Sequence, residues 1–381
     1  MNEVSHHEGR DNREDPSEAA APDPAGDASS ELRYLASFAG LITKLTGRFV
    51  ILGPDTLDQE ISNALREIGE FAAVDRSYVF QFSVDGSHIS NTHEWCAQGI
   101  EAAIQNIQDV PVKEFEWAMS RFKRGEVLYI ERVDDLPADA ESVRAELQRQ
   151  GVQSLINLPL VCAGKVLGFV GFDSVRRVQV WTAEHIKLLE VVSEIIAGAI
   201  ERARTTLALE RQVEMETLVA QISTRFINVP VSQLGAEMHH AIRRIGAFTG
   251  VDRSYVFQFA KGGGRMSNTD EWCADGIEPC MGRLQDLPVD RFAYSMARMR
   301  RGDVFYVADV NDLPPEAAPE KAEFELEGIQ TLINVPITLR GEMIGFLGFD
   351  AVRTRKIWTD DDIRLLKLIG EIFANALDRS S

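Results

Sequence analysis

Residues 75–82 read DRSYVFQF, and the same eight letters return at residues 252–259, 177 positions later. The offset holds without a gap at Trp95 and Trp272. A repeat of this length far exceeds the roughly 20 to 50 residues of solenoid or propeller units, and it matches the roughly 100 to 200 residues of an independent domain. The chain therefore contains one domain twice, and each copy should bury its own core.

The composition is typical of a soluble globular protein, with 45% hydrophobic and 26% charged residues among 381. Its 59 acidic and 40 basic side chains give a formal charge of −19. Such a charge repels phosphate backbones and anionic lipid surfaces, so we expect neither nucleic acid nor a membrane as a partner. The four cysteines form no C-x-x-C pair, which favours reduced thiols and a cytoplasmic location.

Composition and apolar periodicity also divide the chain. Residues 1–30 carry almost no large apolar side chain, so we expect a disordered acidic leader there. The first domain, with flanking helices, is expected over residues 31–204, a helical connector over 205–224, and the second domain over 225–381.

A long helix is expected between the two copies, because no proline interrupts residues 183–226. Its apolar stripe is lost at residues 210–212 and restarts out of register, so the connector is expected to bend or unwind there. The stripe has two interpretations. It either covers each domain separately or forms a bundle in a dimer.

Within the first copy, two residue patterns predict the order of elements. Apolar residues at helical spacing indicate helices, and short runs rich in Val, Ile, Phe and Tyr indicate strands. The turn at residues 162–165 predicts a hairpin between the last two strands. After the entering helices, the predicted strands cover residues 74–82, 89–95, 126–130, 154–161 and 166–173, and the shorter helices cover residues 115–123 and 144–150.

The motifs S-N-T-x-E-W-C-A, L-I-N-x-P, G-F-x-G-F-D and W-T follow one another in both copies. Their order resembles the GAF domain family, in the form found ahead of bacterial histidine kinases and cyclic-di-GMP enzymes. The resemblance covers about residues 48–203 and the chain from residue 225 onward. It implies an α+β fold, PAS-like, with a central antiparallel sheet and helices on one face. A pocket closed by the irregular middle segment is expected on the other face, and a long helix joins the two domains.

Several specialised signatures of this family are missing. The N-K-F-D-E string of cyclic-nucleotide-binding copies does not occur, nor does a cysteine placed as in bilin-binding copies. No G-G-D-E-F, E-A-L or kinase motif is present either. We therefore expect no catalytic residues and no enzymatic activity, and the cofactor or ligand stays unidentified.

Four polar residues are the leading ligand-pocket candidates because both copies carry them. Asn91 and Asn268, with Glu94 and Glu271, lie on a strand that should border the pocket. They either bind a ligand or satisfy the amides of the neighbouring loop.

Two further pairs are included among the pocket candidates. Trp95 and Trp272 either stack on a ligand or fill the core. Asp173 and Asp350 end the G-F-x-G-F-D strand, where a carboxylate is expected to cap the following turn.

The last candidates are Cys96 and Cys273, which act either as redox sensors or as small buried side chains. A metal site at His93 and Cys96 is not expected. Residues three apart on a strand face opposite sides, and the second copy has Asp270 in place of the histidine.

These residues favour a cytoplasmic sensory or regulatory module. An unidentified small molecule would bind in one or both pockets, and dimerising helices would relay its presence to a separate partner. The resemblance implies a histidine kinase or a cyclic-di-GMP enzyme as that partner. Two alternatives remain: a thiol enzyme resembling free methionine sulfoxide reductase, and a ligand-free dimerisation scaffold.

Overall fold

The computed structural model describes residues 24–83 and 85–379, with side chains from Leu32 onward. Of the disordered leader expected at residues 1–30, residues 1–23 lie outside the described residues, whereas residues 24–30 belong to a helix, contrary to expectation. Helix α1 spans Pro24–Val50 and thus begins seven positions before the predicted start. Proline suits the first turn of a helix, because the N–H that it lacks would have no helical partner there.

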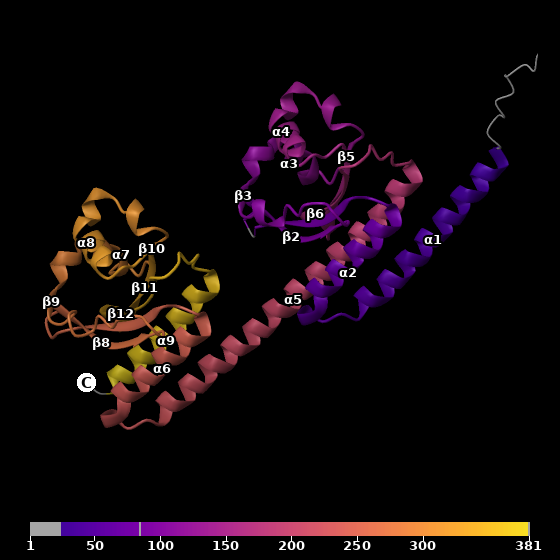
Figure 1. Cartoon of the computed structure of the whole chain (residues 1–381). Coiled ribbons are helices and arrows are strands. Elements are labelled where there is room, and N and C mark those ends of the chain that lie inside the picture. The colour runs from indigo at the N-terminus through magenta and orange to yellow at the C-terminus, as the bar shows by residue number, and fades with distance from the viewer. Residues whose placement is uncertain (1–23, 84, 380–381) are drawn as a thin grey trace, which may run out of the picture. The chain divides into compact units, whose positions relative to one another are not determined.

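The chain divides into two units between Leu207 and Ala208, and each unit contains one copy of the repeat (Figure 1). The elements of the first unit that follow α1 are α2 (Pro54–Ala72), β1 (Arg76–Phe82), β2 (His88–Cys96), β3 (Val110–Pro111), α3 (Glu116–Lys123), β4 (Leu128–Ile130), α4 (Glu141–Arg149), β5 (Ser154–Cys162) and β6 (Lys165–Ser174). Helix α5 (Ala183–Asn228) follows and continues into the second unit.

The second unit repeats this order of elements. They are α6 (Leu234–Thr249), β7 (Arg253–Phe259), β8 (Arg265–Cys273), β9 (Leu287–Pro288), α7 (Ala293–Met299), β10 (Phe305–Val307), α8 (Ala318–Leu326), β11 (Thr331–Leu339), β12 (Glu342–Ala351) and α9 (Asp360–Asp378). Helix α9 starts at a capping box between Thr359 and Asp362.

Each unit is built on one six-stranded sheet. The strand order is β3-β2-β1-β6-β5-β4 in the first unit and β9-β8-β7-β12-β11-β10 in the second. All neighbouring strands run antiparallel, and β5 and β6 form the predicted hairpin. The expected α+β class is confirmed.

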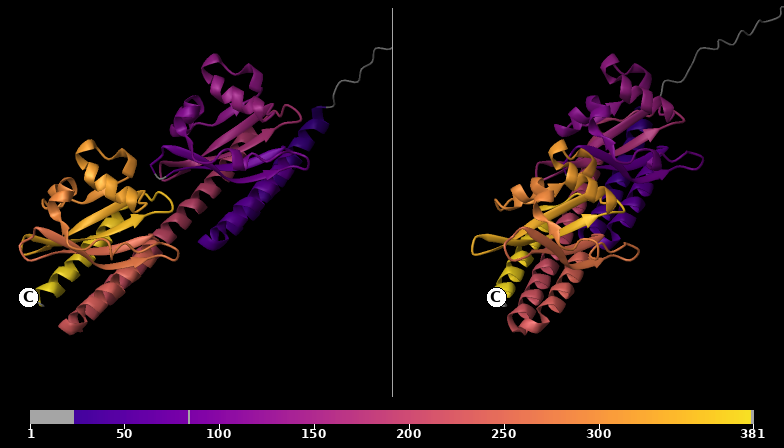
Figure 2. Two further views of the ribbon diagram at one scale, coloured as in Figure 1. Left: turned by 60° about the vertical axis from the view of Figure 1, so that its left-hand side comes forward. Right: turned by 90° about the vertical axis from the view of Figure 1, so that its left-hand side faces the viewer.

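Helices cover the two faces of each sheet differently. In the first unit, α1, α2 and the start of α5 pack on one face, while α3 and α4 lie over the other (Figure 2). Helix α2 faces the sheet because Leu57, Ile61, Leu65 and Ile68 recur at spacings of three and four, and all four are buried.

Helix α5 is continuous through residues 210–212, so the expected unwinding does not occur. Its apolar residues join two separate cores, for example Ile196 in the first unit and Ile222 in the second. Between them Leu209 and Val213 are exposed. The helix persists there because its backbone hydrogen bonds need no buried stripe, and neither glycine nor proline interrupts this stretch.

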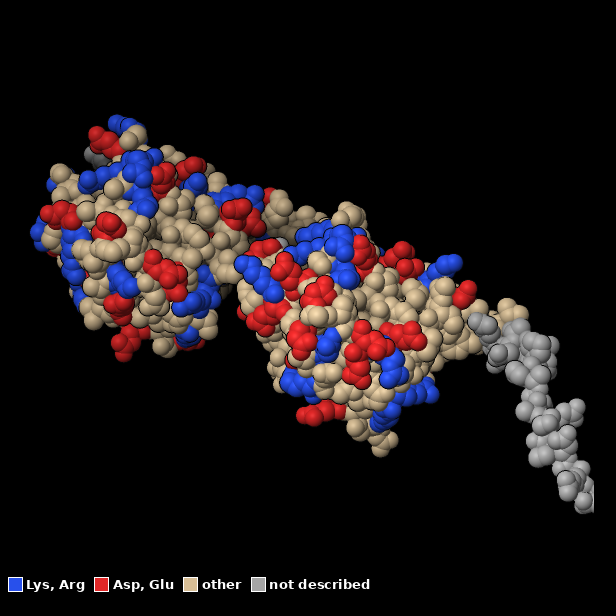
Figure 3. Space-filling view, turned by 90° about the horizontal axis from the view of Figure 1, so that it is seen from above, with Lys and Arg blue, Asp and Glu red and all other residues tan. Residues whose placement is uncertain are grey.

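Charges of both signs are interspersed on the face shown in Figure 3. Within the described ranges, no helix has the length and apolar character needed to cross a bilayer.

Candidate functional site

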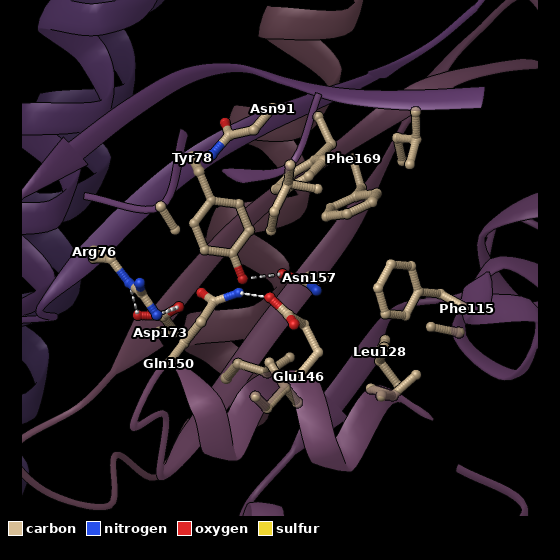
Figure 4. A pocket seen from close by; sticks show the side chains of 18 of the residues that line it. Arg76, Tyr78, Asn91, Phe115, Leu128, Glu146, Gln150, Asn157, Phe169 and Asp173 are labelled. Atoms are coloured by element: carbon tan, nitrogen blue, oxygen red, sulfur yellow. Dashed lines mark hydrogen bonds and ion pairs between the residues drawn. The ribbon is translucent and has the colours of Figure 1, made fainter. Parts of the chain in front are cut away.

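A cavity of about 100 Å³ lies in the first unit, between the sheet and helices α3 and α4. One end is apolar and aromatic. The ring of Phe169 stacks on Phe80 with centroids 4.8 Å apart, and on Phe122 at 4.4 Å. The other end holds the polar side chains shown in Figure 4. An apolar chamber with a few convergent polar groups is the usual form of a small-molecule site.

The second glycine of the G-F-x-G-F-D motif makes room for this polar end. Gly171 lies on β6 directly between Tyr78 of β1 and Asn157 of β5. A Cβ atom at this glycine would come within 2.1 Å of the Tyr78 ring and of Asn157 Oδ1. Because the side chain is missing, the Tyr78 hydroxyl crosses the glycine and donates to Asn157 Oδ1 at 2.9 Å (Figure 4). Gly348 occupies the same place in the second unit, between Tyr255 and Asn334.

A β-bulge brings Asn91 and Glu94 to the same side of the sheet. The pairing of β1 with β2 shifts between Val79 and Phe80, so one extra residue of β2, Thr92, is inserted. Residues three apart would otherwise face opposite sides. With the bulge, Asn91 and Glu94 both line the cavity.

Glu94 holds the segment that closes the cavity. Its Oε2 accepts hydrogen bonds from the backbone N–H groups of Ala103 and Ile104 at 2.8 and 3.0 Å. Gln108 adds a second tether, because its Nε2 donates to the carbonyl of Asn91 at 2.7 Å. Of the two roles predicted for Glu94, the described contacts show the satisfaction of loop amides.

The second unit repeats both tethers. Glu271 Oε2 accepts from the N–H groups of Cys280 and Met281 at 2.8 and 2.9 Å. Gln285 Nε2 donates to the carbonyl of Asn268 at 2.8 Å, as Gln108 does to Asn91. This duplication accounts for the glutamate that both copies carry in the N-T-x-E-W-C string.

Arg76 is a cavity residue that the sequence analysis did not identify. Its Nε and Nη2 donate to the two carboxylate oxygens of Asp173 at 3.1 and 3.0 Å, and both side chains are buried. Burial alone would lower the pKa of Arg76, but the charge of Asp173 outweighs that effect and raises it. A signal was present: an arginine inside an otherwise apolar strand requires a buried acidic partner.

Asp173 does not cap the turn that follows β6, contrary to expectation. The capping residue is Asp75, whose Oδ2 accepts from the N–H groups of Val175 and Arg176 at 2.8 and 2.9 Å. Asp173 cannot reach these amides while both of its oxygens bind the guanidinium of Arg76. The turn after β6 is therefore capped by the residue that directly precedes β1.

The corresponding cavity of the second unit has about half the volume, about 50 Å³. Asn268 and Glu271 line it, whereas Asp350 pairs with Arg253 at 3.1 Å and is not among the lining residues. Arg253 also donates to Cys280 Sγ and to the carbonyl of Glu327 at 3.0 Å. Protein groups thus occupy the surroundings of this guanidinium.

The two tryptophans lie on the opposite face of the sheet from the cavities. A Cβ atom at Gly69 of α2 would come within 2.5 Å of the Trp95 ring, and one at Gly246 of α6 within 2.4 Å of Trp272. Both rings pack against the helix-side cores. The structure therefore places them as packing residues, the second of the two predicted roles.

Cys96 and Cys273 end their strands and are not among the residues that line the two cavities. Burial raises the pKa of Cys96 to about 11 and that of Cys273 to about 12. Both are therefore neutral thiols at pH 7, whereas a reactive cysteine needs a stabilised thiolate. His93 points away from Cys96 toward α2, with Nε2 at 3.2 Å from Asp58 Oδ1. In the part of the chain that the structure describes, no three metal-ligating side chains gather.

Two six-stranded antiparallel sheets, each with helices packed on one face and a cavity under short helices on the other, define a tandem α+β protein of the sensory-domain type. A family model described as "GAF domain" matches residues 56–200 and 233–377. The chain belongs to the GAF domain family, as the motifs predict.

A curated relative shares 31% identity over 196 residues: the methanogenesis regulatory histidine kinase FilI of Methanothrix harundinacea (strain 6Ac). The match covers 49% of this chain but only 21% of the kinase. Among solved structures, the bacteriophytochrome RpBphP3 of R. palustris matches with a TM-score of 0.58 at 13% identity. That match covers 91% of this chain and 76% of the bacteriophytochrome, and it bears on the fold alone. Family and relative together support a sensory or regulatory role.

Proposed function

We propose that the chain is a non-catalytic sensory module that binds a small molecule and relays its presence to a separate signalling protein. A histidine kinase or a cyclic-di-GMP enzyme is the proposed partner, in a cytoplasmic setting. The regulatory kinase FilI, to which half of this chain is similar, supports the first of these partners.

The observation that carries the proposal is the cavity of the first unit. It lies between the sheet and two helices, it has an aromatic end and a polar end, and Glu94 tethers the segment beside it. A volume of about 100 Å³ is of the same order as cavities of ~150 Å³ that bind benzene.

Helix α5 is the proposed relay. It begins nine residues after β6, which forms part of the cavity, and its first half packs on the other face of the same sheet through Leu189 and Ile196. A ligand that favours one packing of the sheet on α5 would change the population of helix positions. The same helix then contributes Leu218 and Ile222 to the second core.

Ligand binding is tested with the full chain and a cell extract of small metabolites. After incubation and desalting, native mass spectrometry should reveal a bound molecule on the folded protein. Protein unfolded before incubation is the control for adhesion to the surface. If no metabolite stays bound and titration calorimetry detects none, the sensory proposal is wrong.

We also propose that the chain forms a homodimer through α5. Leu209 and Val213 lie one helical turn apart and are exposed, whereas Met215 and Leu218 of the same helix are buried in the second core. The double variant Leu209→Glu, Val213→Glu should lower the mass in sedimentation equilibrium from dimer to monomer. A control at exposed polar positions, Glu210→Gln with Glu214→Gln, should leave the mass unchanged. A monomeric wild type would refute this part of the proposal.

For the second unit we propose a role other than ligand binding. Its cavity is smaller, and protein groups surround Arg253. This unit fits the role of a ligand-free scaffold that supports the dimer, one of the two alternatives predicted from the sequence.

A further inference from the structure

The same arginine has different surroundings in the two copies. Arg76 and Arg253 correspond across the repeat, and each pairs with an aspartate near the end of the neighbouring strand in the sheet, β6 or β12. Arg76 is only 2% exposed. Its Nε and Nη2 both bind Asp173, and among residues 24–83 and 85–379 no hydrogen-bond acceptor is found for Nη1. That nitrogen belongs to a side chain lining the cavity (Figure 4).

In the second copy, the matching nitrogen has protein partners. Arg253 Nη1 donates to Cys280 Sγ and lies 3.7 Å from a carboxylate oxygen of Glu327. Arg283 lies on the other side of that carboxylate, also at 3.7 Å. Burial raises the pKa of Glu327 to about 7, with both arginines acting in the opposite direction. The second copy thus places a thiol and a carboxyl group where the first has an open donor.

Three substitutions create this difference. The positions of Cys280, Arg283 and Glu327 are held in the first copy by Ala103, Asn106 and Gln150. Ala103 lacks the thiol that accepts from Arg253 in the second copy. Gln150 donates from its Nε2 to Glu146 Oε1 at 2.6 Å. The first copy therefore has a buried charge with an unused donor next to the larger cavity. Arg76 Nη1 is not among the fully buried polar atoms that lack a partner, so it is open to the cavity and can donate to a group that enters it.

We propose that the first cavity binds the carboxylate end of a small, mainly apolar molecule, with Nη1 of Arg76 donating to the carboxylate, and that the second cavity does not bind it. This inference rests on the proposed sensory function and specifies both its ligand class and the unit that binds.

The remaining polar groups of the cavity favour this orientation. Its own carboxylates are already engaged: Asp173 by Arg76, and Glu94 by two backbone N–H groups. Glu146 is held by Arg149 at 2.5 Å and by Gln150. Arg76 Nη1 is therefore matched by an acceptor on the ligand. In the second copy, the carboxyl group of Glu327 lies near the corresponding nitrogen of Arg253. The aromatic end, with Phe80 and Phe169 stacked, suits a ring or a short hydrocarbon chain.

The test uses the full chain and defined probes. Benzoate, phenylacetate and hexanoate are titrated by calorimetry, each paired with its neutral amide of the same shape. We expect at least one carboxylate to bind with one site per chain, and its amide to bind at least tenfold more weakly. Charge-assisted hydrogen bonds to guanidinium account for this preference.

Reciprocal exchanges locate the site. Ala103→Cys, Asn106→Arg and Gln150→Glu together give the first copy the residues of the second, and should weaken binding at least tenfold. Cys280→Ala, Arg283→Asn and Glu327→Gln make the opposite exchange, and should raise the stoichiometry to two sites. Each new residue already occurs at the matching position of the other copy, and thermal unfolding of both variants verifies folding.

Three results would overturn the inference. They are equal affinity for acid and amide, two sites in the wild type, and binding that the first set of exchanges leaves unchanged. If every carboxylate fails to bind while a neutral metabolite from the extract binds, the carboxylate anchor is wrong and the sensory function stands. If neither class binds, both proposals fail.

Discussion

The position that holds His93 in the first copy holds Asp270 in the second, and burial favours the neutral form of each side chain. It lowers the pKa of His93, with Asp58 acting in the opposite direction. It raises the pKa of Asp270 to about 6, with Thr269 opposing that shift. Both effects have one cause, because a charge loses hydration when it is packed between the sheet and its helices.

Asp270 therefore makes stability depend on pH. Its pKa is higher in the folded than in the unfolded chain, so the folded state binds more protons between about pH 4 and 6. Over this interval the free energy of unfolding falls as pH rises. Asp270→Asn removes the effect and should stabilise the protein at pH 7.5 by on the order of 1 kcal/mol, after allowance for partial exposure to solvent.

Urea unfolding at pH 7.5 and at pH 4 measures this difference. The gain should be present at pH 7.5 and vanish at pH 4. Asp290→Asn, at an exposed position of the same unit, is the control and should change the midpoint little at either pH. A midpoint at pH 7.5 that stays at or below that of the wild type would contradict the assignment.

At the scale of elements, one carboxylate holds the segment between β2 and β3 to the sheet in the first unit, and another holds the segment between β8 and β9 in the second. Glu94 receives two backbone N–H groups, and Glu271 receives the equivalent pair. Without the carboxylate of Glu94, the amides of Ala103 and Ile104 lose their acceptor. The segment between β2 and β3, which is the cover of the cavity, is then released from β2. The cavity thus depends on a side chain outside α3 and α4, the two helices over it.

Glu94→Ala should consequently loosen the cover more than it disturbs the rest of the fold. Two buried N–H groups left without an acceptor cost about 2 kcal/mol. The amides of Ala103 and Ile104 should exchange with deuterium roughly 10- to 30-fold faster, by that free energy. Mass-spectrometric hydrogen exchange of the matching peptides provides the measurement.

Glu101→Ala is the matched control, because Glu101 lies in the same segment with an exposed side chain. Its exchange rates should equal those of the wild type. Acceleration spread evenly over all peptides of the first unit would instead indicate global destabilisation, and unchanged rates at residues 103 and 104 would rule out the tether.

For the whole molecule, the decisive property is that each unit has its own interior. The buried apolar clusters of the first unit contain no residue beyond Ile200, and those of the second contain none before Met215. Helix α5 contributes to both, yet the two sets of buried side chains are separate. Each unit is large enough to bury a sufficient core alone.

Separate expression of residues 24–207 and 208–381 tests this independence. Each fragment should fold and unfold cooperatively in urea, since the cut in α5 falls between its two buried stretches. Circular dichroism at 222 nm, with the full chain as reference, follows the transitions. A fragment that loses its signal linearly, with no transition, would show that the units depend on each other.

Several features of the fold follow from local patterns. The string DRSYVFQF and its repeat predict two domains, and the apolar periodicity predicts α2. The turn at residues 162–165 predicts the hairpin β5-β6, and the absence of proline predicts the long helix α5. The unwinding expected at residues 210–212 was wrong, because a lost apolar stripe removes burial but not helical hydrogen bonds. Asn91 and Glu94 were predicted as cavity residues, although their spacing alone would separate them.

The amino-acid sequence by itself determined that the domain is duplicated, that its class is α+β and to which family it belongs. Apolar periodicity and turn residues act over short stretches and recur in both copies. Only the tertiary structure decided which side chains meet. Arg253 finds Cys280 and Glu327 at separations of 27 and 74 residues, while Arg76 finds no such partners. The bulge at Thr92 likewise depends on pairing with another strand. Contacts of this kind arise from how the sheet brings distant segments together, and no local pattern encodes them.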